Sequence, residues 1–166
     1  MGRIGLLANP ASGKDVRRLV ARASVFDNQE KRAIIRRALI GALSTGCREF
    51  VFHNDAHGIC SQAIEELGDQ ICATPVDSTQ MGNVLDTISA ARAMAAAECD
   101  VVMTLGGDGT NRAFCLGWQD APLLPISTGT NNVFPSLREA TIAGAAAGLI
   151  ATGKVGEDVF TQQKCI

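Results

Sequence analysis

The chain has 166 residues, of which 46% are hydrophobic and 19% are charged, and its formal net charge is -2. This composition is typical of one globular domain with its own core, and it excludes an intrinsically disordered chain. It also argues against a general nucleic-acid-binding protein, which would carry a surplus of basic residues. Any phosphate ligand must therefore be held locally, by backbone N–H groups and a few cations.

The six cysteines and the apolar stretches indicate the compartment. The cysteines show no CxxC spacing and form no metal-binding pattern with His53 or His57, so we expect reduced, small hydrophobic side chains. No signal peptide is visible before the strand-like segment that starts at Ile4. The most apolar stretch, residues 140–151, is much shorter than the roughly 20 residues needed to cross a bilayer. We therefore expect a cytoplasmic protein without a membrane partner.

Apolar periodicity and turn residues alternate strands with helices along the chain. In chain order we expect a strand over 4–8, helices over 15–23 and 30–43, a strand over 49–53, a helix over 61–67, a strand over 70–74, a helix over 83–97, a strand over 100–105, a helix over 111–116, a strand over 122–126 and a helix over 138–151. Strands separated by such helices require crossover connections. The sequence therefore predicts an α/β fold of three Rossmann-like layers, with helices on both faces of a mainly parallel sheet. The strand over 122–126 contains two prolines, so we expect it to be short or at an edge.

Three turns rich in glycine or asparagine follow three of the expected strands. They cover residues 9–14, 106–110 and 127–132. In a parallel sheet of this kind, ligands bind at the carboxyl ends of the strands. All three turns should therefore lie at one edge of the sheet, where they can form a single site.

The second of these turns combines three glycines with a carboxylate. Gly106, Gly107 and Gly109 let a ligand approach the backbone closely. The helix that follows offers unpaired N–H groups and a partial positive charge at its N-terminus. Together these features predict an anion site, with Thr110 or Asn111 as the helix cap. The alternative is a tight strand-to-helix turn without a ligand.

Asp108 is the informative residue of this turn. Two unit charges 4 Å apart repel by about 4 kcal/mol at an effective dielectric of 20, so a carboxylate beside a phosphate is unfavourable. We therefore expect Asp108 to face a metal ion or an acceptor hydroxyl, and both roles belong to phosphoryl transfer. The Rossmann fingerprint G-x-G-x-x-G fails here, because Arg112 stands at its third glycine position.

The run from residue 106 to residue 110, Gly-Gly-Asp-Gly-Thr, matches the signature shared by ATP-NAD kinases and diacylglycerol or sphingosine kinases. The chain resembles this superfamily, since the run lies between a strand and a helix, as the family requires. The resemblance implies a phosphofructokinase-like fold and a catalytic role for Asp108, as a base or as the residue that orients the hydroxyl or metal. It implies phosphate contacts for the cofactor-binding candidates Gly106, Gly107, Gly109 and Thr110. A general base contributes roughly a factor of 10²–10⁴.

The first turn, Asn-Pro-Ala-Ser-Gly-Lys, also resembles this superfamily. By this resemblance Asn9, Ser12 and Gly13 contact nucleotide phosphate. The turn is not a P-loop, because Ala8 and Asp15 stand where G-x-x-x-x-G-K-[ST] requires its first glycine and its Ser or Thr. The alternative is an ordinary turn with a helix cap.

The third turn resembles a motif of the lipid kinases of the superfamily, which carry Pro-x-Gly-Thr-x-Asn-Asp at this place. Gly129, Thr130 and Asn132 match, whereas Ser127 and Val133 replace the proline and the aspartate, which disfavours a lipid kinase. The run Gly-Thr-Asn-Asn-Val-Phe-Pro is more similar to the acetoin-catabolism protein X group, an ATP-NAD kinase-like branch. The three matching residues are therefore cofactor-binding candidates, with a ribose or phosphate oxygen as partner. The alternative is a polar loop that satisfies its own backbone.

The resemblance extends from Ile4 to about Lys154 and implies a kinase-like phosphotransferase. The implied cofactors are ATP, or another phosphate donor, and Mg²⁺. NAD is the implied acceptor, phosphorylated at its adenosine 2′-hydroxyl to give NADP. Because the second, β-rich domain of the family is absent, we expect a nucleotide-binding domain over residues 1–152. Residues 153–166 are expected to start the second domain or form a tail, and a homo-oligomer is expected when that domain is present.

Two other functions stay open. One is a non-catalytic nucleotide-binding or regulatory module related to acetoin catabolism, and the other is a kinase with a different hydroxyl acceptor. A Rossmann oxidoreductase is disfavoured, because the fingerprint fails and no suitable acidic residue follows a second strand about 20 positions later.

Overall fold

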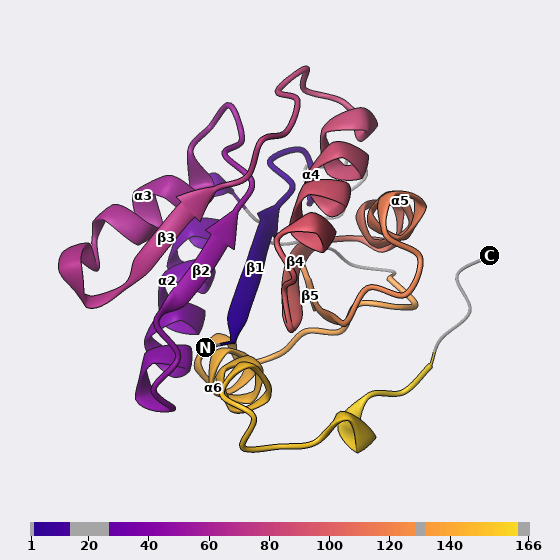
Figure 1. Cartoon of the computed structure of the whole chain (residues 1–166). Coiled ribbons are helices and arrows are strands. Elements are labelled where there is room, and N and C mark those ends of the chain that lie inside the picture. Colours follow the sequence, from indigo (N-terminus) through magenta and orange to yellow (C-terminus); the bar gives the residue numbers. More distant parts are fainter. Residues whose placement is uncertain (1, 14–26, 129–131, 163–166) are drawn as a thin grey trace.

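The computed structural model describes residues 2–13, 27–128 and 132–162 (Figure 1). In chain order the elements are β1 (Arg3–Ala8), α2 (Asn28–Ser44), β2 (Glu49–Phe52), α3 (Ile59–Glu65), the 3₁₀ helix η1 (Gly68–Gln70), β3 (Cys72–Pro75), α4 (Val84–Ala96), β4 (Val101–Gly106), α5 (Asp108–Gly117), β5 (Leu123–Ser127), α6 (Ala140–Ala151) and the 3₁₀ helix η2 (Glu157–Val159). The expected alternation of strands and helices is confirmed over these ranges. The helix expected over residues 15–23 lies outside the described residues.

The five strands form one parallel sheet in the order β3-β2-β1-β4-β5. At its centre, Ile4 of β1 pairs with Phe50 of β2 on one side and with Val101 of β4 on the other. The chain runs outward from β1 through β2 to β3, crosses back to β4, and continues outward to β5. The connections therefore diverge between β1 and β4, where sheets of this kind bind ligands. The expected edge position of β5 is confirmed.

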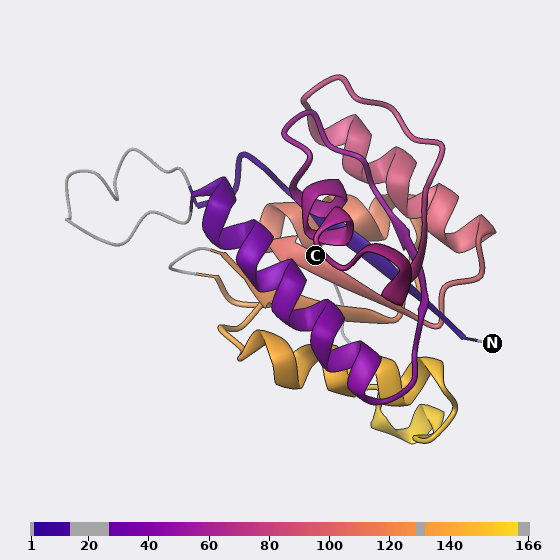
Figure 2. The same cartoon turned by 90° about the vertical axis from the view of Figure 1, so that its left-hand side faces the viewer.

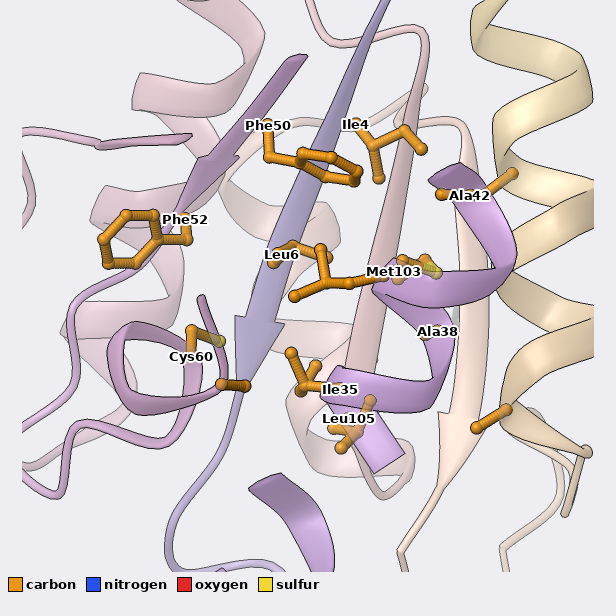
Figure 3. Close-up of a cluster of buried hydrophobic side chains, with 14 of the residues drawn as sticks. Ile4, Leu6, Ile35, Ala38, Ala42, Phe50, Phe52, Cys60, Met103 and Leu105 are labelled. Carbon is orange, nitrogen blue, oxygen red and sulfur yellow. The ribbon is translucent and has the colours of Figure 1, made fainter. Parts of the chain in front are cut away.

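Helices cover both faces of the sheet, so the domain has three layers (Figures 1 and 2). Successive residues of a strand point to opposite faces. Leu6 belongs to a core cluster formed with α2, α3 and α6, and Figure 3 shows it near Ile35. Leu7 instead packs in a second cluster with Met94 of α4 and Phe114 of α5. Each fully buried side chain of this size contributes about 1.5–3 kcal/mol, so the two clusters fix the strand register and hold the strand ends in place.

Helices α2 and α6 pack backbone against backbone because glycines line their contact. A Cβ added to Gly144 would lie 1.8 Å from the carbonyl oxygen of Ala38. One added to Gly148 would lie 2.1 Å from Oγ1 of Thr45. Small residues therefore allow these two helices to pack closely on this face of the sheet.

The cysteines that the structure describes are free thiols. Cys47, Cys60 and Cys99 are buried, whereas Cys72 is exposed. Burial raises the pKa of the Cys60 thiol well above its usual range, and it raises that of Cys99 to about 12. The buried thiols therefore stay protonated at neutral pH and pack as small apolar side chains, as expected. Among the described helices, none is long and apolar enough to cross a membrane.

The largest boundary difference is at α5, which begins at Asp108 and not at Asn111. The carbonyl of Gly107 accepts the backbone N–H groups of Thr110 (3.1 Å) and Asn111 (3.2 Å), so the first helical turn starts inside the glycine run. The prediction that Thr110 or Asn111 caps this helix is wrong. Both lie inside α5, and its N-cap is Gly107, without a side-chain hydrogen bond.

Candidate functional site

Backbone hydrogen bonds hold the three turns at one edge of the sheet, as expected for turns that follow parallel strands. The N–H of Asn9, which follows β1, donates to the carbonyl of Leu105 in β4 (2.9 Å). The N–H of Thr128, which follows β5, donates to the carbonyl of Gly106 at the end of β4 (3.4 Å). The second turn therefore lies between the other two at this edge of the sheet.

Asn9 joins the first turn to the second. Its Nδ2 donates to Oγ1 of Thr110 in α5 (2.8 Å), and its Oδ1 accepts the backbone N–H of Ala11 (2.9 Å). The bond to Thr110 crosses from β1 to β4, where the chain connections diverge. Asn9 and Thr110 are thus brought together, and each has a positioning role that their motifs did not reveal.

Ser12 joins the first turn to the third. Its hydroxyl donates to the carbonyl of Asn9 (2.8 Å), so the 2.7 Å contact with Thr128 is made with the Thr128 hydroxyl as donor. Thr128 is fully buried and was not among the predicted site residues, although it lies within the third turn. Gly13 follows with a φ of 77°, in the left-handed region where glycine is favoured.

The three glycines of the second turn serve different purposes. A Cβ on Gly106 would lie 2.5 Å from Cβ of Thr110, and one on Gly107 would lie 2.9 Å from Oδ1 of Asn132, so both positions exclude a side chain. A Cβ on Gly109 would meet no atom within 4 Å, and none of the three has a positive φ. Gly109 is exposed, and its N–H has no acceptor among the described residues. An anion can therefore approach the amides of α5 over Gly109.

Asp108 is the first residue of α5, and its carboxylate is turned toward the third turn. Oδ1 accepts the backbone N–H groups of Val133 (3.1 Å) and Phe134 (2.9 Å), and Oδ2 lies 3.0 Å from the nitrogen of Val133. The side chain stays partly exposed at the sheet edge and does not enter the core. A negative charge is favourable at this end of a helix. These bonds also give Asp108 a structural role, that of holding the third turn, which the sequence did not indicate.

Asn132 connects the third turn to the second. Its Oδ1 accepts the N–H of Asp108 (3.3 Å), and its Nδ2 donates to Oγ of Ser127 (2.8 Å). Both ends of the amide are therefore bonded within the protein. The other two candidates of this turn, Gly129 and Thr130, lie outside the described residues.

The donor set of the site limits how it can hold a metal ion. Among the described residues, no group of three His, Cys, Asp or Glu side chains is placed to bind one. Asp108 is the carboxylate that the described parts of the three turns offer. This suits Mg²⁺, which binds through one or two carboxylates together with substrate phosphates.

A family model described as the ATP-NAD kinase N-terminal domain matches residues 4–155. The chain belongs to the ATP-NAD kinase family. The match spans all three turns of the candidate site and every element from β2 to α6.

One curated relative of this ATP-NAD kinase domain is acetoin catabolism protein X of Cupriavidus necator. The two are 36% identical over 159 residues, which cover 92% of this chain and 44% of the relative. The chain thus spans less than half the length of that relative. No solved structure matches the chain.

Lys31 also contacts the candidate site, although it was not among the predicted site residues. Its side chain is fully buried, and its Nζ donates to the carbonyls of Asn9 and Pro10, both at 2.9 Å. The signal was present in the sequence, because Lys31 precedes Ile34 and Ala38 by three and seven residues. That spacing places it on the buried stripe of α2, where a lysine is unusual.

Proposed function

We propose that this domain binds nucleotide phosphate at the edge formed by the three turns and takes part in phosphoryl transfer from ATP to NAD. The acceptor is the adenosine 2′-hydroxyl of NAD, and the product is NADP. The observation that carries the proposal is the position of Asp108, at the N-terminus of α5, beside the open space over Gly109 and facing the third turn. Phosphoryl transfer requires such a pair, an anion site next to a carboxylate that orients the attacking hydroxyl.

The phosphate contacts of the proposal come mainly from uncharged donors. The N-terminus of α5 carries about half a positive charge and exposes the N–H of Gly109. Asn9 and Ser12 of the first turn lie beside it, since they bond Thr110 of α5 and Thr128 of the third turn. When bound, Mg²⁺ would screen the remaining negative charge of the donor phosphates. Asp108 is the carboxylate that would hold the ion.

Asp108 would handle the proton of the acceptor. In the proposed reaction the 2′-hydroxyl oxygen attacks the γ-phosphorus of ATP, the bond from that phosphorus to the β–γ bridging oxygen breaks, and ADP leaves. The hydroxyl proton passes to the Asp108 carboxylate. A carboxylate has about four lone-pair sites, and Oδ2 contacts one shared N–H group, so it retains capacity to accept the hydroxyl.

The chain spans less than half of its relative, so features of a whole protein enter only as proposals. We propose that residues 1–152 supply the nucleotide-binding half. Residues 153–166 would then lead into a β-rich second domain that completes the acceptor site and supports a homo-oligomer. The protein would work in the cytoplasm, where ATP and NAD are available.

The proposal is tested by Asp108→Asn in the full-length protein. ATP and polyphosphate serve as donors, and NAD, NADH and small alcohols serve as acceptors. We expect the transfer rate to fall by about a hundredfold or more, because the amide cannot take the proton, while ATP affinity is kept. Ser127→Ala is the matched control, since it removes a hydrogen bond that holds the third turn and leaves the carboxylate in place. An equal loss in both variants would show that Asp108 acts only by holding the third turn.

A non-catalytic nucleotide-binding module is the second candidate, and one observation favours it. The Asp108 carboxylate is already bonded to the amides of Val133 and Phe134, which a purely structural residue would also be. The two functions differ in one result. If the wild-type protein binds ATP or NAD and transfers no phosphate between any of these donors and acceptors, the binding module is the function.

A further inference from the structure

Lys31 is fully buried, at 0% exposure, beneath the first turn of the candidate site. Lysine is almost never fully buried unless its ammonium is well bonded. Its Nζ donates to the carbonyls of Asn9 and Pro10, both at 2.9 Å, and lies 3.4 Å from Oδ1 of Asn28 on the same helix. The first turns of α2 therefore direct a cation at the backbone of the turn that follows β1.

The carbonyl of Asn9 is the point where this contact meets the rest of the site. It accepts the Lys31 ammonium at 2.9 Å, the Ser12 hydroxyl at 2.8 Å and the Ser12 N–H at 3.3 Å. The side chain of Asn9 bonds Thr110, and Ser12 bonds Thr128. Lys31 thus contacts Asn9, which bonds the second turn and accepts a hydrogen bond from Ser12, the residue that bonds the third turn.

Core packing alone does not account for a lysine at this position. Lys31 lies on the stripe of α2 that contains Ile34, Ile35 and Ala38, where a methionine or leucine would fill the space. Burying an ammonium carries a large desolvation penalty, which an apolar side chain avoids. What the ammonium adds is a set of donors that can hold two successive carbonyls in one orientation.

We propose that Lys31 is a positioning residue that fixes the Asn9–Pro10 segment and, through Asn9 and Ser12, sets the spacing of the three turns for a phosphate. The effect of Lys31 on phosphate binding rests on the proposed function. The effect of Lys31 on the Asn9–Pro10 segment does not, because the contacts that produce it are present without a ligand.

The first test is Lys31→Met in the full chain, without any ligand, followed by amide hydrogen exchange. Exchange at Ala11 and Ser12 should accelerate by about tenfold or more, because both amides donate to Asn9. The exchange rate at Met103 in β4 should rise only as far as the change in the free energy of unfolding accounts for. Leu39→Ala is the matched control, since it removes a fully buried side chain from the same helix without touching the first turn. Should Lys31→Met fail to fold, Lys31→Arg keeps the charge and moves the donors, and the same acceleration is expected.

The second test is a double-mutant cycle on ATP affinity with Lys31→Met and Asn9→Ala. We expect Lys31→Met to weaken ATP binding about ten- to hundredfold, as loss of a hydrogen bond to a charged group does. If Lys31 acts through Asn9, the double variant should lose little more than the weaker-binding single variant.

The outcomes distinguish a failure of the positioning role of Lys31 from a failure of the proposed function. Unchanged exchange at Ala11 and Ser12, or losses of affinity that multiply, would overturn the role assigned to Lys31. If the wild-type protein binds no ATP, the proposed function fails, and the exchange experiment alone decides whether Lys31 positions the turn.

Discussion

Gly109→Ala tests whether glycine is required at this position by a ligand or by the fold. A Cβ at this position meets no atom within 4 Å, and Gly109 has no positive φ, so the substitution introduces no strain. Alanine is better than glycine in a helix by about 0.5–1 kcal/mol. The variant should therefore be as stable as the wild type or more stable by about 0.5 kcal/mol, which corresponds to a Tm increase of roughly 1–2 °C in a domain of this size.

The same methyl group occupies the space through which a phosphate would approach the amides of α5. Loss of one hydrogen bond to a charged oxygen is worth about 1.5–3 kcal/mol, so ATP affinity should fall by roughly ten- to hundredfold. Calorimetric titration with ATP measures the affinity, and thermal unfolding measures the stability. Arg92→Ala, an exposed change on α4, is the control and should keep both values. A Gly109→Ala variant that binds ATP like the wild type would refute a phosphate site over this glycine.

Three further predictions concern stability and are checked by denaturant unfolding. Gly106→Ala should destabilise the domain by about 1–3 kcal/mol, because its Cβ would lie 2.5 Å from that of Thr110, and an unchanged midpoint would show that the turn adapts. Gly144→Ala should cost about 3 kcal/mol or more, since the Cβ would lie 1.8 Å from the backbone carbonyl of Ala38, and a smaller loss would mean that α2 and α6 separate easily. Burial is the largest single effect on the pKa of Asp86 and raises it, but four hydrogen bonds together outweigh burial and lower the pKa. Asp86→Asn should therefore lose about 1–2 kcal/mol at pH 7. This gap to the wild type should close as the pH falls below the ordinary value of 3.8 and through the lower folded pKa, and a gap independent of pH would contradict the assignment.

The fold was predictable because the patterns that indicate its strands and helices are local in the sequence. Strands β1 and β4 are apolar runs followed by a breaker, and the apolar stripe of α2 with Ile34, Ile35 and Ala38 is buried. The start of α5 was not predictable in this way, because glycine and aspartate are poor helix formers. There the carbonyl of Gly107 begins the helix through two hydrogen bonds, and local preference gives no sign of this.

The positions of three candidate residues along the chain were predictable, whereas their contacts and the parts played by Lys31 and Thr128 were not. The motifs placed Asn9, Asp108 and Asn132 at strand ends, where the structure has them. Their partners lie far away in sequence: Thr110 is 101 residues from Asn9, and Val133 is 25 residues from Asp108. Such contacts depend on which strands are neighbours, and the pattern of a single sequence does not fix the strand order.

The bonds of Asp108 to the third turn also bear on how the proposed reaction would begin. The amides of Val133 and Phe134 now bind one anion, the carboxylate of Asp108. A phosphate oxygen is an equally good acceptor for these amides, so an incoming nucleotide can take them over with little change in the number of hydrogen bonds. Like charges repel, so the same event would turn the carboxylate away from the phosphate, which leaves it able to accept the acceptor hydroxyl. The structural role of Asp108 in the free protein and its proposed role in catalysis are therefore compatible, as successive states of one side chain.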